Sequence, residues 1–427
     1  MSSPVNEPTS PLRIADYRRF WLSRFTAVLA TTGMVVIIGY QLYDVARAEY
    51  AMSIKQAAFQ LGLLGLVQFL PLFVLTPVAG VVADRFDRRK VAAFAMGVDA
   101  VIALGLAIST MLETRNLPLL FAFAALHGAA RVFVSPAMSA IAPGIVPPAL
   151  IPRAIALNSI AWQAGTVIGP ASYGFLFASD RALPYWTSLV LIGIAIVCVL
   201  AIRNLPPLAA DARKAHPVRQ IMDGFHFVWN ERFLLGCVTL DLFAVLLGGA
   251  TALLPIFARD ILHVGPEGLG QMRAAPAFGA ALVALWLSVR PLERNVGVKM
   301  LVAVAAYGAM TVAFGFSRYF LVSLGLLALL GAADMVSVFV RSSLIQLNTP
   351  DDKRGRVSAI SGLAISASNE LGEMQSGLAA AMLGATGAVV FGGSAAIVVT
   401  ILWAWLFPEL RRARTFAPQH RQRKPVP

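Results

Sequence analysis

The chain has 427 residues, of which 58% are hydrophobic and only 13% are charged, and its mean hydropathy is +0.73. Soluble globular chains carry about 45–50% apolar and about 25% charged residues, so this composition excludes an ordinary cytosolic enzyme. The net charge of +13 would suggest nucleic acid in a soluble protein, but here the basic residues fall in short segments between apolar stretches and form no basic face. We therefore expect the lipid bilayer, and no nucleic acid, as a partner.

Long apolar stretches recur along the whole chain. A bilayer core about 30 Å thick needs about 20 residues of helix, and each stretch reaches roughly that length. Because lipid offers backbone groups no hydrogen-bond partners, we expect helices, and the alternating pattern of a membrane barrel is missing from the sequence. The twelve expected spans are residues 20–43, 57–79, 91–112, 117–137, 152–178, 184–202, 233–258, 268–289, 298–316, 320–340, 357–383 and 387–407.

The distribution of Lys and Arg predicts the orientation. With the N-terminus inside, 27 basic residues fall on the cytoplasmic side and seven on the opposite side. Such a bias predicts cytoplasmic N- and C-termini. Residues 1–19 are polar and lack a cleavable signal pattern, so we expect the first apolar stretch to stay as the first span of a multi-pass protein of the bacterial inner membrane.

Repeats and linkers divide the chain. A shift of 203 residues superposes residues 127–131 on 330–334 and, without a gap, Pro147 on Pro350, which predicts two related halves of six spans each. Between them, apolar residues recur at helical spacing from Ile221 to Trp229, as in an amphipathic helix on the cytoplasmic face, although a solvated connector is the alternative. The expected parts are a tail (1–19), a half (20–203), a linker (204–232), a half (233–408) and a basic tail (409–427).

The loop after the second span is rich in glycine and charge. Asp84 is placed to cap or pair with a neighbouring helix end, and the arginines can bridge to acidic groups and carbonyls. Such a clasp would hold the inward side closed; a simple positive-inside anchor is the alternative. The residues concerned are Gly80, Asp84, Arg85, Arg88 and Arg89.

The fifth span contains small residues and a proline. Glycines let helices approach closely, and the proline removes a backbone hydrogen bond and bends the helix. A generic packing face is the alternative to a functional motif. The residues concerned are Gly165, Gly169, Pro170 and Gly174.

These two motifs resemble those of the major facilitator superfamily. The loop is similar to its Gly, Asp-Arg and basic-pair pattern, with Phe86-Asp87 where the family commonly shows a glycine. The fifth span resembles the Gly-Pro motif of its drug–proton antiporters, with Tyr173 in place of a glycine. Residues 241–260 resemble the seventh span of the branch containing enterobactin-type siderophore exporters. The resemblance implies an all-α fold of about twelve helices in two pseudo-symmetric halves, and export in preference to uptake.

Ionisable residues inside spans cost roughly 2.5–3.5 kcal/mol each, so each one needs a reason. The resemblance places spans 1, 4, 7 and 10 around a central cavity, and the repeat sets Arg131 opposite Asp334, which predicts an ion pair across the cavity. A static pair of Asp99 with Arg131 is the alternative. The arginine that many antiporters carry on the fourth span is replaced by Ala124 here. The candidate coupling residues are Arg131, Asp334, Asp241, Asp99, Glu370 and Glu373.

We therefore expect a monomeric secondary exporter of amphipathic small molecules, such as siderophores or drugs, that works by alternating access and is coupled to the proton gradient. No phosphate-binding Gly-x-x-x-x-Gly-Lys-Ser/Thr loop occurs, and no acid–base or metal spacing is present, so we expect neither enzyme activity, cofactor nor metal. The alternatives are a facilitator-type importer of small solutes and a membrane-embedded lipid-handling protein.

Overall fold

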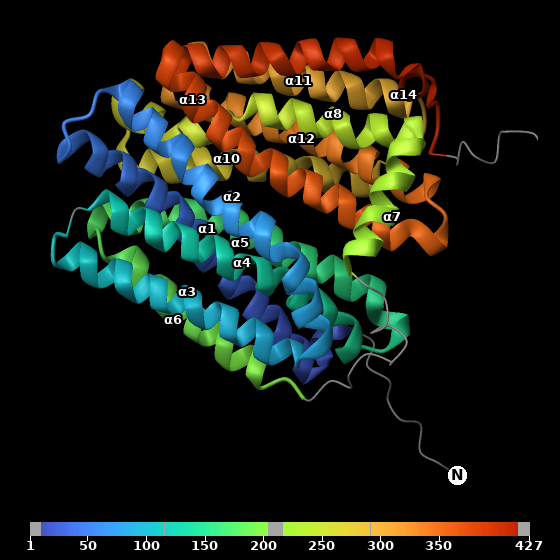
Figure 1. The fold of residues 1–427 in the computed structure, drawn as a ribbon, viewed down its shortest axis with the longest axis horizontal. Coiled ribbons are helices and arrows are strands. Elements are labelled where there is room, and N and C mark those ends of the chain that lie inside the picture. The colour runs from blue at the N-terminus through green and yellow to red at the C-terminus, as the bar shows by residue number, and fades with distance from the viewer. Residues whose placement is uncertain (1–9, 115, 204–216, 291, 417–427) are drawn as a thin grey trace, which may run out of the picture. The chain divides into compact units, whose positions relative to one another are not determined.

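The computed structural model describes residues 10–114, 116–203, 217–290 and 292–416, and the regular elements in these ranges are all helices (Figure 1). The longer helices are α1 (Ala15–Ala48), α2 (Ile54–Arg85), α3 (Arg88–Met111), α4 (Leu117–Ile145), α5 (Ile151–Ser179), α6 (Leu183–Leu200), α7 (Pro217–Asn230), α8 (Arg232–Gly248), α10 (Gly265–Val289), α11 (Val296–Phe316), α12 (Phe320–Asn348) and α13 (Asp351–Leu406). The short elements are η1 (Pro11–Arg13), η2 (Pro148–Leu150), η3 (Ala250–Leu253), α9 (Leu254–Ile256), η4 (Phe257–Ile261) and α14 (Pro408–Arg412).

The predicted membrane spans correspond to these helices. Ten helical stretches among the described residues are long and apolar enough to cross a membrane. One of them, 354–406, has 53 residues and contains Gly384, whose φ of 78° and ψ of 165° break the helix. Because a span needs about 20 residues, this stretch supplies two spans. With α5, which covers the predicted span 152–178, all twelve predicted positions are helical, and the predicted fold class is confirmed.

The internal repeat is also visible in the helix bounds. The shift of 203 residues carries Leu117–Ile145 onto Phe320–Asn348, which are the bounds of α4 and α12. The same shift carries the start of α5 to residue 354, close to the start of α13. The repeat found in the sequence therefore corresponds to equivalent helices in the structure, α4 and α12.

The chain folds into two compact units. Unit 1 comprises Met1–Ile38 and Leu70–Ala215, and unit 2 comprises Gly39–Phe69 and His216–Pro427. Each unit has its own hydrophobic core: residues such as Phe20 and Met96 fill the first, and Met300 and Leu344 fill the second. The ends of α1 and α2 and their connecting loop thus belong with the C-terminal helices.

The linker contains the predicted helix. Residues 204–216 lie outside the described residues, and α7 follows them. Val228 is buried in the core of unit 2, whereas Met222, Phe225 and Trp229 are exposed. This separation of buried and exposed apolar side chains is that of a helix which packs on the protein and presents a second apolar stripe outward; its placement at the membrane surface stays a prediction.

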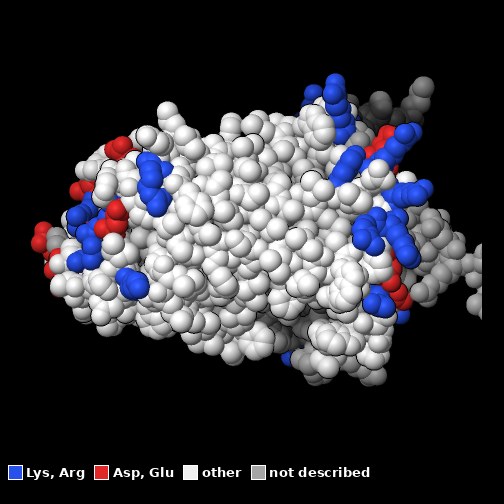
Figure 2. Space-filling model, turned by 90° about the horizontal axis from the view of Figure 1, so that it is seen from above, with Lys and Arg blue, Asp and Glu red and all other residues white. Residues whose placement is uncertain are grey.

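Charged side chains are distributed as a bilayer requires. On the face drawn in Figure 2, Lys, Arg, Asp and Glu gather at two opposite ends, and a broad surface of other residues lies between them. Apolar side chains exposed on this scale are unfavourable in water but match the hydrocarbon core of a membrane.

Candidate functional site

The loop between α2 and α3 is organised by Asp87. Its Oδ1 accepts a hydrogen bond from the backbone N–H of Arg89 at 3.0 Å and so caps α3. The Arg89 guanidinium binds the same carboxylate through Nε at 3.1 Å and Nη2 at 2.6 Å, and it also donates to the carbonyl of Ile202. Burial opposes ionisation of Asp87, but the hydrogen bonds from Arg89 and the charges of Arg89 and Lys90 outweigh it and lower the pKa of this carboxyl. Arg89 therefore ties the start of α3 to the end of α6.

The other residues of this loop are placed as follows. Arg85 ends α2 and is exposed, and Arg88 begins α3 and is half-buried. Gly80 and Asp84 lie in α2, but the structure does not describe the surroundings of either residue. The predicted clasp of Asp84 therefore stays a prediction. The loop's role as a gate is likewise a prediction.

The small residues of α5 pack directly on α1. A methyl group at Gly169 would lie 2.4 Å from Oγ1 of Thr32 and 2.6 Å from the carbonyl oxygen of Leu29. At Gly165 it would lie 2.8 Å from Cγ1 of Val28. Real Cβ contacts are not this short, so only glycine permits the two helices to approach so closely. Pro170, buried inside α5, and the buried Gly174 continue this motif.

Tyr173, which stands where the related antiporter motif has a glycine, is accommodated by a glycine on the partner helix. A methyl group at Gly33 would lie 2.3 Å from Cγ of Tyr173, so the tyrosine ring occupies the space that a side chain on α1 would need. The ring is buried, and its hydroxyl is 2.9 Å from Oγ of Ser188. The close α1–α5 contact is thus kept, with the large side chain on α5 (Tyr173) and the glycine on α1 (Gly33).

Three charged residues meet inside unit 2. The guanidinium of Arg341, on α12, forms an ion pair with Asp241 on α8, and both side chains are largely buried. Asp334 lies about two helical turns before Arg341 on α12. The charges of Asp241 and Arg341 both act on its carboxyl group. One ion pair and a second carboxyl group therefore lie within electrostatic range of one another in spans of the same unit.

Asp99 and His127 form a second polar contact, inside unit 1. Oδ1 of Asp99 on α3 and Nδ1 of His127 on α4 are 2.8 Å apart, and both residues are buried. Arg131 lies one turn further along α4 and is half-buried. Because Arg131 belongs to unit 1 and Asp334 to unit 2, the predicted pair between them stays a prediction.

The two glutamates of the predicted coupling set lie on α13. Glu373 forms an ion pair with Arg273 of α10 at 3.5 Å, and Arg273 also donates to the carbonyl of Thr251 at 3.0 Å. Glu370 is buried, and its backbone carbonyl is 3.0 Å from where a methyl group at Gly65 would stand. Both glutamates therefore lie at the packing seam of α13.

Comparison with known proteins assigns the family. A family model described as Major Facilitator Superfamily matches residues 20–373, most of the chain. The chain belongs to the major facilitator superfamily. Members of this superfamily are membrane transporters, so the protein is a multi-pass transporter and not an enzyme.

Curated relatives match nearly the whole chain, and solved transporter structures share its fold. The enterobactin exporter EntS of Citrobacter koseri is 26% identical over 415 residues, covering 94% of each chain. EntS of Shigella boydii serotype 18 is 25% identical over 411 residues, again covering 94% of each chain. A D-xylose-proton symporter structure has a TM-score of 0.71 and 14% identity over 92% of this chain and 98% of its own. The nucleoside transporter NupG has a TM-score of 0.66 and 12% identity over 92% and 99%.

Sequence reasoning missed Arg341. Because Arg341 follows the predicted span 320–340, the sequence predicts it among the cytoplasmic basic residues, but α12 continues to Asn348, and Arg341 is buried beside Asp241. The repeat does not supply the missing signal, because the predicted spans 117–137 and 320–340 already agree under the 203-residue shift and both end before the position of Arg341. The capping role of Asp87 is also not predicted by the sequence, because the family pattern of this loop assigns the acidic role to the position of Asp84.

Proposed function

We propose that this transporter is a proton-coupled secondary exporter of amphipathic small molecules, such as siderophores or drugs. The observation that supports coupling most directly is the group of Asp241, Arg341 and Asp334 in unit 2. The two carboxyl groups and the guanidinium together carry a net charge of −1 when all three are ionised. One proton makes the group neutral, so proton binding and release change the charge inside the spans by one unit.

This change of charge can be linked to alternating access. A buried ion pair is stable only while its geometry is kept, because each charge depends on its partner for the solvation it lost. If the second carboxyl, Asp334, turns toward Arg131 in one state and toward Arg341 in the other, the proton is taken up in one state and released in the other. Rocking of the two halves would then be driven by proton entry, with no cofactor and no ATP.

Two observations support export in preference to uptake. The relatives found over 94% of the chain are named enterobactin exporters. The α1–α5 contact at Gly165 and Gly169 preserves the close helix packing of the antiporter-like motif. An importer of small solutes is the outcome to be tested against this proposal.

The remaining features of the proposal follow from the distribution of charge. The basic termini and loops favour a location in the bacterial inner membrane with both termini in the cytoplasm, and we expect the protein to act as a monomer. The partners are the small-molecule substrate and the lipid bilayer, and nucleic acid is not among them.

Transport in inside-out vesicles tests the proposal. A panel of catecholate siderophores and cationic drugs is offered at the outer face of such vesicles, and accumulation is followed with and without a pH gradient. Asp241→Asn and Asp334→Asn should each reduce gradient-driven accumulation at least tenfold. The matched control is Asp223→Asn, which removes an exposed carboxylate of α7 that pairs with Arg356 of α13. This variant should leave gradient-driven accumulation unchanged. Equal accumulation with and without the pH gradient would contradict proton coupling. Accumulation only in right-side-out vesicles would contradict export.

A further inference from the structure

The end of α1 is attached to the C-terminal helices. α1 belongs to unit 1 up to Ile38 and to unit 2 from Gly39, together with the loop and the first half of α2. The positive-inside distribution places this end of α1 on the outer side of the membrane. The continuous helix α1 therefore contributes its first part to unit 1 and its last part to unit 2.

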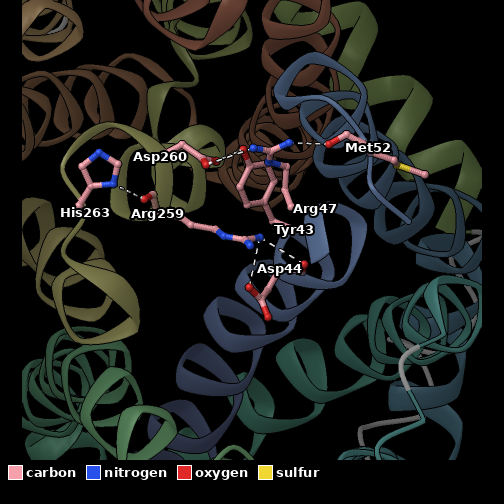
Figure 3. Close-up of polar contacts among 7 residues, drawn as sticks. All are labelled: Tyr43, Asp44, Arg47, Met52, Arg259, Asp260 and His263. Carbon is pink, nitrogen blue, oxygen red and sulfur yellow. Dashed lines mark hydrogen bonds and ion pairs between the residues drawn. The ribbon is translucent and has the colours of Figure 1, made fainter. Parts of the chain in front are cut away.

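Charged side chains hold the end of α1 against η4 (Figure 3). Nη1 of Arg259 is 3.1 Å from Oδ1 of Asp44 and donates to the backbone carbonyl of the same residue at 3.2 Å. Nη2 of Arg47 is 3.5 Å from Oδ1 of Asp260, whose other oxygen accepts a hydrogen bond from the hydroxyl of the buried Tyr43. Arg47 also donates to the carbonyl of Met52 at 2.6 Å, which fixes its guanidinium beside the loop.

The backbone of η4, which carries Arg259 and Asp260, forms a π-helix. The N–H of Leu262 reaches the carbonyl of Phe257 at 2.7 Å, five residues back, and widens the turn that carries Arg259 and Asp260. His263 follows with a φ of 53° and lies 2.9 Å, through Nδ1, from the carbonyl oxygen of Arg259. Single π-turns inside helices are uncommon and often occur at functional positions.

Next to this cluster, α2 and α13 touch through their backbones. A methyl group at Gly377 would lie 2.3 Å from Cα of Gly62, and one at Gly62 would lie 2.9 Å from the carbonyl oxygen of Met374. Lys55 donates to the carbonyl of Met382 at 3.1 Å. The charged cluster thus flanks a seam of small residues that has no room for side chains.

We propose that Tyr43, Asp44 and Arg47 of α1 and Arg259 and Asp260 of η4 form an outer latch. These five are positioning residues of the transport cycle: they hold the outer side closed and must separate before the outer side opens. Alternating access requires the outer ends of the N-terminal helices to leave the C-terminal helices, and every contact of the latch joins these two parts.

The chemistry of the latch suits a contact that is made and broken in each cycle. The four charged side chains are 17–27% exposed, so water can solvate them when they separate, unlike the buried pair of Asp241 and Arg341. Each partner contributes one acid and one base, and the closed arrangement is electrically neutral. A shift of α1 along η4 that brought Arg47 next to Arg259 would place like charges together. The order of charges therefore also determines how α1 and η4 align when they come together.

A buried reporter tests the latch without substrate. Ala58 on α2 is fully buried, and its backbone carbonyl lies 2.8 Å from where a methyl group at Gly377 would stand. In a background lacking Cys198 and Cys237, Ala58→Cys is labelled with a fluorescent maleimide on purified protein in lipid nanodiscs, where the reagent reaches both faces. The labelling rate then reports how often the seam opens.

The variants break and restore one pair of the latch. Arg259→Asp should raise the labelling rate about tenfold, because it removes one attraction and adds a repulsion from Asp44. The exchange Asp44→Arg with Arg259→Asp should return the rate to within about threefold of the parent. Tyr43→Phe, which removes only a hydroxyl, should raise it about threefold. Arg318→Asp makes the same charge change at the α11–α12 connection, outside the latch, and should leave the rate within about twofold.

Unchanged labelling in both Arg259→Asp and Tyr43→Phe would overturn the latch, as would a double exchange that labels as fast as the single variant. Tyr43→Phe keeps the inference testable if Arg259→Asp does not fold. The measurement uses no substrate and no gradient, so its failure leaves the proposed export untouched, and failure of proton-driven export leaves the latch untouched.

Discussion

Replacing Arg341 by methionine should destabilise the protein strongly. The side chains of Arg341 and Asp241 are only 4% and 11% exposed, and methionine preserves most of the arginine volume while removing its charge. The variant leaves the Asp241 carboxylate buried beside a second acid, Asp334, with no cation. Breaking a buried pair in this way costs about 3–5 kcal/mol, which lowers the folded-to-unfolded ratio about a hundredfold to several thousandfold.

The double variant Asp241→Leu with Arg341→Met separates stability from transport. It removes both charges and fills the site with apolar groups, so its free energy of unfolding should lie within about 1–2 kcal/mol of the parent. Its proton-driven transport should nevertheless be lost, because Asp334 no longer has Asp241 and Arg341 as charged partners with which to exchange a proton. The coupling free energy between the two positions, taken from the complete double-mutant cycle, should therefore be large and favourable.

The assay is reversible unfolding of purified protein in mixed micelles with increasing denaturing detergent. Arg318→Met, which removes a guanidinium that donates to the carbonyls of Gly315 and Ser317, serves as control and should change stability by less than about 1 kcal/mol. An Arg341→Met variant as stable as the parent, or a double variant less stable than that single variant, would refute the assignment of Asp241 and Arg341 as a dependent pair.

Three further predictions concern unit 1 and its loop. Gly169→Leu should destabilise the protein by about 1–3 kcal/mol in thermal unfolding, because the side chain collides with α1, whereas Gly193→Leu, which meets nothing within 4 Å, should not. His127→Leu should cost about 1–3 kcal/mol by leaving Asp99 without its imidazole partner, and adding Asp99→Leu should recover most of the loss. Because the pKa of Asp87 is lowered in the folded state, its carboxylate stabilises the start of α3 at neutral pH, and this contribution should disappear as the pH falls below 3.8 and through the folded-state pKa. Hydrogen exchange in the first turn of α3 should then differ between the parent and Asp87→Asn at pH 7, and the difference should shrink progressively as the pH is lowered below 3.8; a difference that does not shrink would contradict this role of the Asp87 carboxylate.

Helices and the repeat could be predicted because both depend on the number and order of apolar residues. The bounds of α4 and α12 agree under the 203-residue shift, and the break at Gly384 falls between two predicted spans. Apolar length alone underestimated the ends: α12 continues beyond residue 340, because polar side chains that find partners inside the protein do not terminate a helix.

Partners of polar residues could not be predicted from spacing. The contact of Asp99 with His127 joins two neighbouring helices. It depends on how each helix is rotated about its own axis, and sequence alone does not give this rotation. The same holds for the packing of Tyr173 over Gly33, where a departure from the family pattern on one helix is answered by a glycine on another. Such compensation is visible only when both helices are placed.

The seam between α2 and α13 offers a way to fix the transporter in one state. Since nothing larger than hydrogen fits between Gly62 and Gly377 when the helices are together, a tryptophan at either position would act as a steric wedge. With the orientation and the latch proposed above, the wedge would exclude the closed outer side and favour the open arrangement, independently of any charge. A single bulky substitution at this seam would then be a tool for capturing the outward-facing conformation in structural studies and for selecting binders that recognise it.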